Sequence, residues 1–263
     1  MTAIATPVPP TTVRRTATAR PRSYLDQWFC LCTYPVVISL LTLTMFLVGP
    51  FLPPISPSAT PSEVAAIYLA DSSVIAIPII VLVFTVGVQV PLQGLVIDRM
   101  RQMPNRGKLL SWVYLVSYAG ATLPSGGLLV AFFGCAVLRP DRDPAALQAL
   151  NDLAFLGLIA VISGFLVQYA ALALAIFLDR GRIMPLWFGY VSVWATVSEL
   201  LFVPGYLIPH GPFAWNGLLD FWLGLGLYGV WAVGLVLALR QTILKQQQAE
   251  LERSPALLPV EAT

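Results

Sequence analysis

The feature that most constrains this chain is its series of long apolar runs. A helix needs about 20 apolar residues to cross the roughly 30 Å of hydrocarbon in a bilayer. Strands of a membrane barrel would instead alternate apolar and polar residues over about ten positions, and no such alternation is visible. The sequence therefore predicts an all-α, polytopic bundle of six transmembrane helices. The runs lie at about 32–52, 73–97, 109–138, 153–178, 184–208 and 217–240.

The composition agrees with a membrane protein. Of the 263 residues, 57% are hydrophobic and 11% are charged, whereas roughly 25% of the residues in an ordinary soluble domain are charged. The formal net charge is only +2. No basic stripe interleaved with aromatic residues is present, so no nucleic-acid partner is expected.

Lysine and arginine fall mostly on one side of the predicted bilayer. They occupy both tails and the loops that follow the second and fourth runs, while Arg139 and Arg142 alone lie on the other side. Cytoplasmic loops retain positive charge during insertion. The sequence thus predicts a multi-pass protein of the cell membrane whose N- and C-termini are both cytoplasmic.

Three regions follow from this threading. Residues 1–28 are rich in Thr, Ala, Pro and Arg, and they are expected to form a disordered cytoplasmic tail because they lack apolar periodicity. The membrane domain spans 29–241, and a cytoplasmic tail covers 242–263. The last helix is expected to continue into that tail as a polar helix until Ser254-Pro255 stops it.

Two loops on the outer side contain helix-start patterns. Thr60 and Glu63 have the spacing of a capping box, which predicts a short helix at about 61–70. Asp143, which precedes a proline, is a start of the same kind ahead of the fourth run. Both segments are expected to lie on the outer surface of the bundle.

Cysteine and histidine counts exclude several kinds of chemistry. Cys30, Cys32 and Cys135, with His210 as the single histidine, make neither a disulfide framework nor a zinc site. Haem held by two histidines is excluded by the same count. No phosphate-binding glycine loop and no serine nucleophile elbow occurs. We therefore predict no metal and no cofactor.

Glu199 lies deepest of the ionisable residues, inside the apolar stretch VSELLFVPGYLIPHG at 197–211. An ionisable side chain near the bilayer centre costs about 2.5 to 3.5 kcal/mol to insert, so it usually faces the bundle interior and marks a pathway, a relay or a ligand site. His210, Asn216 and Asp220 follow on the connection to the last helix, and the four residues are expected to converge on an outward-facing pocket. The alternative is that Glu199 only bonds a neighbouring helix, with Asp220 a cap and His210 a surface residue.

Other polar and aromatic residues complete the candidate site. Gln89 and Gln93 are four apart and share a helix face, and Gln168 falls in the middle of its run. Trp222 belongs to a dense aromatic segment, which suits either a lipid-like ligand or an interfacial belt. The predicted ligand-binding residues are Glu199, Asp220, His210, Asn216, Gln168, Trp222, Gln89 and Gln93.

Three segments carry a resemblance. RPDRDPAALQALNDLAFL, HGPFAWNGLLDFW and PPISPSATPSEVAAIY resemble an actinobacterial family of uncharacterised multi-pass membrane proteins, over roughly residues 30–240. The resemblance implies a shared six-span fold and carries over no activity, substrate or catalytic residue. The chain is also similar in type to sterol isomerases of the emopamil-binding class, whose motifs do not match here in order, so no roles are transferred.

Three functional hypotheses remain. In the first, the protein binds or helps to move a small hydrophobic or amphipathic molecule, such as a lipid, sterol or terpenoid, in a pocket around Glu199. In the second, it is a cofactor-free acid–base enzyme, an isomerase or cyclase, in which Glu199 donates a proton and Asp220 or His210 accepts or stabilises it. In the third, it is an accessory or structural subunit. The expected partners are membrane lipids, the ligand, and either another membrane protein or a second copy of the chain.

Overall fold

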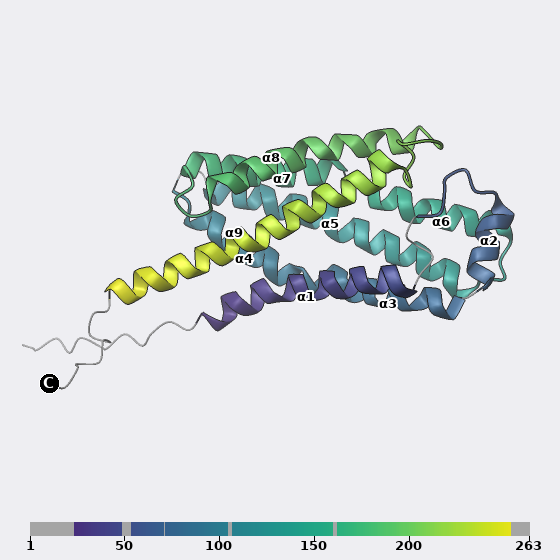
Figure 1. Cartoon of the computed structure of the whole chain (residues 1–263), viewed down its shortest axis with the longest axis horizontal. Coiled ribbons are helices and arrows are strands. Elements are labelled where there is room, and N and C mark those ends of the chain that lie inside the picture. The colour runs from purple at the N-terminus through teal and green to yellow at the C-terminus, as the bar shows by residue number, and fades with distance from the viewer. Residues whose placement is uncertain (1–23, 49–53, 71, 105–106, 160–161, 254–263) are drawn as a thin grey trace, which may run out of the picture.

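The chain is helical throughout its described part. The computed structural model describes residues 24–48, 54–70, 72–104, 107–159 and 162–253, and every regular element in these ranges is a helix (Figure 1). The elements in chain order are α1 (Leu25–Val48), α2 (Pro61–Ala70), α3 (Ser72–Val88), α4 (Val90–Gln102), α5 (Gly107–Leu138), α6 (Pro144–Ile159), α7 (Ile162–Asp179), α8 (Leu186–Ser198), the 3-10 helix η1 (Glu199–Tyr206), the π-helix η2 (Leu218–Leu223) and α9 (Gly224–Arg253).

Five helical segments among the described residues are long and apolar enough to cross a membrane. The apolar stretch Leu25–Leu40 of α1 is shorter than these five. The predicted helical class is therefore confirmed, with five such segments, and a sixth span stays a prediction. The five segments are Val74–Gln102, Gly107–Leu138, Pro144–Asp179, Leu186–Tyr206 and Leu218–Glu252.

The long helices lie lengthwise beside one another (Figure 1). α1 begins and α9 ends at the same end of the bundle, which we call the terminal end. α2 and the connection between η1 and η2 lie at the opposite end, which we call the loop end. An even number of crossings would produce this arrangement, since both described ends of the chain lie on one side.

Buried apolar side chains form two clusters that correspond to these ends. One surrounds Met100, Leu172 and Leu235 towards the terminal end, and the other surrounds Tyr68 and Leu147 at the loop end. Large apolar side chains are also exposed on the outside of the bundle, for example Trp194 at 71% and Phe84 at 66%. Extended apolar surface of this kind marks a contact with lipid or with another protein.

The structure describes a part of each predicted tail. α1 begins at Leu25, so residues 25–28 of the predicted disordered segment 1–28 are helical. Residues 1–23 lie outside the described residues. α9 continues to Arg253, so the tail 242–263 is helical as far as it is described, and the predicted stop at Ser254-Pro255 lies outside the described residues.

The two predicted helix starts are confirmed. The Thr60 N–H and hydroxyl both donate to Glu63 Oε2, at 2.7 and 2.9 Å, and the Glu63 N–H donates back to Thr60 Oγ1 at 3.4 Å. This reciprocal pair begins α2, which buries Val64 and Tyr68 towards α6. At the start of α6, the Ala145 N–H donates to Asp143 Oδ1 at 2.9 Å.

Glycine sets the separation between α5 and α7. A Cβ atom at Gly164 on α7 would lie only 2.4 Å from the Cβ of Ala121 on α5. Ala121 is itself fully buried, so neither side chain can move aside. The two helices approach this closely because position 164 has no side chain.

We expect Gly164→Ala to lower the free energy of unfolding by about 1 to 3 kcal/mol, since the added methyl group overpacks the helix contact. Gly120→Ala is the matched control, because a Cβ atom at Gly120 meets nothing within 4 Å. That change should be neutral or should stabilise the helix by up to about 1 kcal/mol. Unfolding of both variants in detergent tests this, and equal stabilities would contradict the close contact.

A second prediction concerns pH. Hydrogen bonds from the Thr60 N–H and hydroxyl hold the pKa of Glu63 below its ordinary value. Because the folded-state pKa is lowered, this stabilisation is present above the ordinary pKa and is lost as pH falls through the folded value. We expect amide protection of α2 to fall on acidification in the wild type and to change little in Glu63→Gln. Hydrogen exchange measures this, and the same acid loss in Glu63→Gln would assign it to another group.

Candidate functional site

Buried tyrosines and glutamines occupy the centre of the bundle. The Tyr114 hydroxyl of α5 donates to Gln93 Oε1 of α4 at 2.5 Å, and both residues are buried. The hydroxyl oxygens of Tyr34 on α1 and Tyr228 on α9 also lie 2.5 Å apart. Two pairs of helices are thus joined by hydrogen bonds, of which the bond between Tyr114 and Gln93 is fully buried.

Five tyrosines lie within electrostatic range of one another in this region. We call them the tyrosine cluster: Tyr34, Tyr114, Tyr118, Tyr169 and Tyr228. Gln168 lies beside the cluster, where its Oε1 accepts a bond from the Thr122 hydroxyl at 3.3 Å. The buried Tyr118 hydroxyl has no partner among the described residues. The cluster therefore retains unused hydrogen-bonding capacity.

Glu199 lies where α8 gives way to the 3-10 helix η1. Its residue is 9% exposed, and its carboxyl group lies within electrostatic range of Tyr169 and Tyr228. Within the described part of the chain, no hydrogen bond reaches that carboxyl group. Pro204 in η1 lacks an N–H, so it removes one backbone hydrogen bond from this segment.

Asp220 is a second buried acid, at 1% exposure, and it lies in the π-helix η2. Its Oδ1 has no partner among the described residues. A Cβ atom at Gly205 would lie 2.7 Å from Asp220 Oδ2, so η1 and η2 meet at this glycine. Single turns of π-helix occur often at functional sites, and each irregular segment of this hairpin carries one buried carboxyl group.

The structure distributes the predicted site residues over several environments. Glu199 and Asp220 are buried in the hairpin, and Gln93 and Gln168 are buried beside the tyrosine cluster. His210 is exposed on the connection, which agrees with its alternative as a surface residue. The three remaining residues are only partly covered: Asn216 and Gln89 are half-buried, and Trp222 is 39% exposed.

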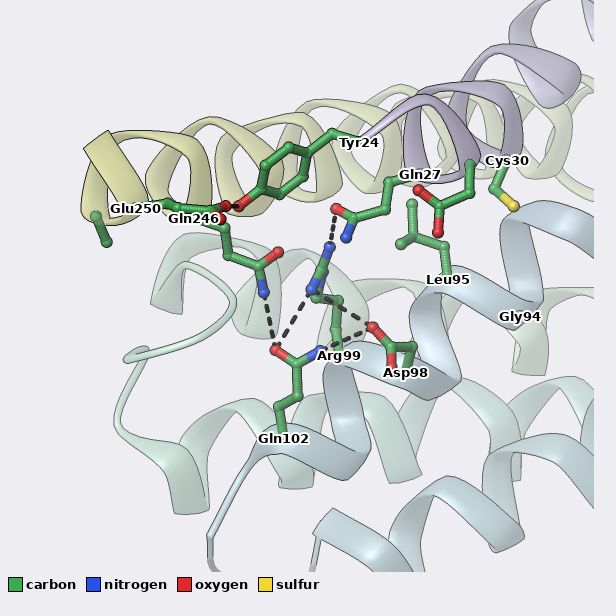
Figure 2. A pocket seen from close by; sticks show the side chains of 12 residues that line it. Tyr24, Gln27, Cys30, Gly94, Leu95, Asp98, Arg99, Gln102, Gln246 and Glu250 are labelled. Atoms are coloured by element: carbon green, nitrogen blue, oxygen red, sulfur yellow. Dashed lines mark hydrogen bonds and ion pairs between the residues drawn. The ribbon is translucent and has the colours of Figure 1, made fainter. Parts of the chain in front are cut away.

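Arg99 is a buried polar residue that sequence reasoning missed. It lies on α4 at 0% exposure and lines a cavity of about 990 Å³ at the terminal end (Figure 2). The pattern that could have found it is its spacing from Leu92, Leu95 and Val96, because residues three, four and seven apart share one helix face. All three are buried, so Arg99 points with them into the bundle.

Metal chemistry has no obvious site in the described ranges. No three His, Cys, Asp or Glu residues there come together to hold an ion. The three cysteines are free. Three acids are buried in the described ranges: Glu199 and Asp220 in the hairpin, and Asp179, whose Oδ2 accepts a bond from the Ile183 N–H at 2.7 Å. The polar groups considered for function are the two hairpin acids, the tyrosine cluster and Arg99.

Comparisons with known proteins assign no family to this arrangement. No protein-family model matches the chain, and neither a curated protein nor a solved structure matches it. The resemblance to an actinobacterial membrane family therefore stays a prediction.

The hydrogen bond between Tyr114 and Gln93 gives a prediction about the interior. Tyr114→Phe leaves the buried Gln93 oxygen without that bond, so it should lower the free energy of unfolding by about 1 to 3 kcal/mol. Tyr190→Phe is the control because Tyr190 is 63% exposed. Denaturation in detergent compares the two variants, and equal losses would mean that the buried bond adds nothing.

Proposed function

We propose that this chain is an integral membrane protein of six spans that binds or helps to move a small hydrophobic or amphipathic molecule. Five long apolar helices support a membrane location. The shared end of the first and last helices supports six spans (Figure 1). The excess of Lys and Arg at that end supports cytoplasmic termini and insertion into the cell membrane.

Glu199 carries the proposal for binding. A buried polar group without a hydrogen bond costs free energy, and an acid within an apolar helix costs more. A hydroxyl, amine or carbonyl group on a ligand would supply the bond that the carboxyl group lacks within the described chain. The rings of Tyr169 and Tyr228 offer apolar surface beside it, which suits a lipid, sterol or terpenoid.

Asp220 favours a second candidate function, a cofactor-free isomerase or cyclase. Acid–base catalysis on a lipid-like substrate needs one group to donate a proton and another to accept it. Glu199 and Asp220 are two buried carboxyl groups on one hairpin, and the Oδ1 atom of Asp220 is unpartnered among described residues. The exposed position of His210 makes Asp220 the better second group.

Native mass spectrometry with lipid extraction tests the Glu199 site. We expect the wild type to retain a distinct small molecule, and Glu199→Gln to retain at least tenfold less of it. Glu63→Gln is the control, since that glutamate is exposed on α2.

Other outcomes discriminate between the hypotheses. Equal retention of bulk membrane lipid alone by all three proteins would contradict the binding proposal and favour an accessory subunit. A chemically altered molecule on the wild type, with the unaltered form on Glu199→Gln, would favour the enzyme.

A further inference from the structure

The cavity at the terminal end is lined by residues of three helices and of the segment directly before α1. It has a volume of about 990 Å³ and lies among α1, α4 and α9 (Figure 2). The Tyr24 hydroxyl, directly before α1, donates to Glu250 Oε2 of α9 at 2.6 Å. The contact between Tyr34 and Tyr228 joins the same two helices farther along the bundle. The cavity therefore lies between two fixed contacts of α1 with α9.

Arg99 lines this cavity with a guanidinium group that the described chain satisfies only in part. Its Nη2 donates to Gln27 Oε1 at 2.6 Å, and its Nη1 donates to Gln102 Oε1 at 3.3 Å. The Asp98 carboxylate lies 3.5 Å from Nη1, but the Asp98 side chain is 57% exposed. Nε has no partner among the described residues. The partners of this buried cation are two neutral amides and one solvated carboxylate. Its guanidinium group can therefore donate further hydrogen bonds to an anionic oxygen.

The acidic side chains of the cavity limit which anion fits. Asp26 and Asp98 line the cavity with Arg99, so negative charge is in excess among these three described residues. A simple anion would be repelled by this excess, whereas an ammonium group would be attracted. A ligand that carries both charges satisfies Arg99 and the carboxylates together.

The depth of the cavity indicates where such a ligand comes from. Gln102 ends the apolar segment Val74–Gln102, and Asp26 lies in the first turn of α1. In a bilayer that these helices cross, this level is the polar headgroup layer. Lipid headgroups are therefore the charged groups present at highest concentration there.

We propose that this cavity binds a zwitterion that joins a phosphate to an ammonium group, as phosphoethanolamine does. Arg99 takes the phosphate oxygens, because a guanidinium group pairs with phosphate through two parallel hydrogen bonds. Asp98 and Asp26 take the ammonium group. The volume suits such a ligand, since small-molecule sites measure about 300 to 1,000 Å³. This site uses other residues than Glu199, at the other end of the bundle, and so goes beyond the proposed function.

Native mass spectrometry of the full chain, titrated with phosphatidylethanolamine or phosphatidylglycerol, tests the site. We expect the wild type to bind phosphatidylethanolamine at least tenfold more tightly. Arg99→Gln should weaken that binding at least tenfold, and Asp98→Asn should abolish the preference over phosphatidylglycerol. Arg101→Gln is the matched control, because Arg101 is exposed on the same helix and stacks 5.0 Å from the Trp112 ring centroid; it should bind as the wild type does.

Further measurements distinguish a free zwitterion from a lipid headgroup and identify the results that would overturn the proposal. Thermal stabilisation by soluble glycerophosphoethanolamine, lost in Asp98→Asn, would identify a free zwitterion, and an effect of the lipid alone would identify a headgroup. Equal binding of both lipids by the wild type would overturn the proposal. If Arg99→Gln does not fold, the Asp98→Asn variant still tests the proposal. It would overturn the proposal if it preferred phosphatidylethanolamine over phosphatidylglycerol as strongly as the wild type does. Glu199→Gln should keep the preference, so the two proposals can fail separately.

Discussion

Once water is excluded, every backbone N–H and C=O group must find a hydrogen-bond partner inside the chain. The rest of the structure depends on this constraint. In hydrocarbon a helix meets this need within one segment, which is why long apolar runs become helices. Two neighbouring helical segments of the described chain, η1 and η2, are not of the α type. Each holds a buried carboxyl group, Glu199 or Asp220. Irregular backbone at such depth is tolerated where protein or a cavity satisfies it, so this hairpin is the natural place for function.

Hydrogen bonds between polar side chains also join the helices and hold them in register, which apolar contact alone would not do. Tyr34 with Tyr228 connects the first and last helices, and Tyr114 with Gln93 connects the consecutive helices α4 and α5. These bonds separate two polar regions, the acids towards the loop end and the cavity of Arg99 at the terminal end. A molecule with a polar head and an apolar body has suitable contacts in each region, which is consistent with an amphipathic ligand.

Local features were predictable and distant juxtapositions were not. Thr60 and Glu63 begin a helix because both lie in one turn, so their spacing alone specifies the hydrogen bonds. Burial of Glu199 followed from its depth in an apolar run. Arg99, by contrast, follows the second apolar run, and the sequence therefore predicts that it lies in a cytoplasmic loop. The spacing of Arg99 on α4 is compatible with burial, but its hydrogen bond to Gln27, 72 positions earlier in the sequence, is a contact that no local pattern encodes.

The sequence by itself determined the helical class, the positions of most helices and the sidedness expected from its positive charges, because these depend on hydrophobicity, capping and charge along one segment at a time. Only the tertiary structure decided which polar groups meet. It placed His210 on the surface, brought Asp220 against Gly205 and enclosed Arg99 between α1 and α9. The physical reason is that the free-energy cost of burying a charge depends on the groups that surround it. Those groups come from other helices, which become neighbours only when the chain packs.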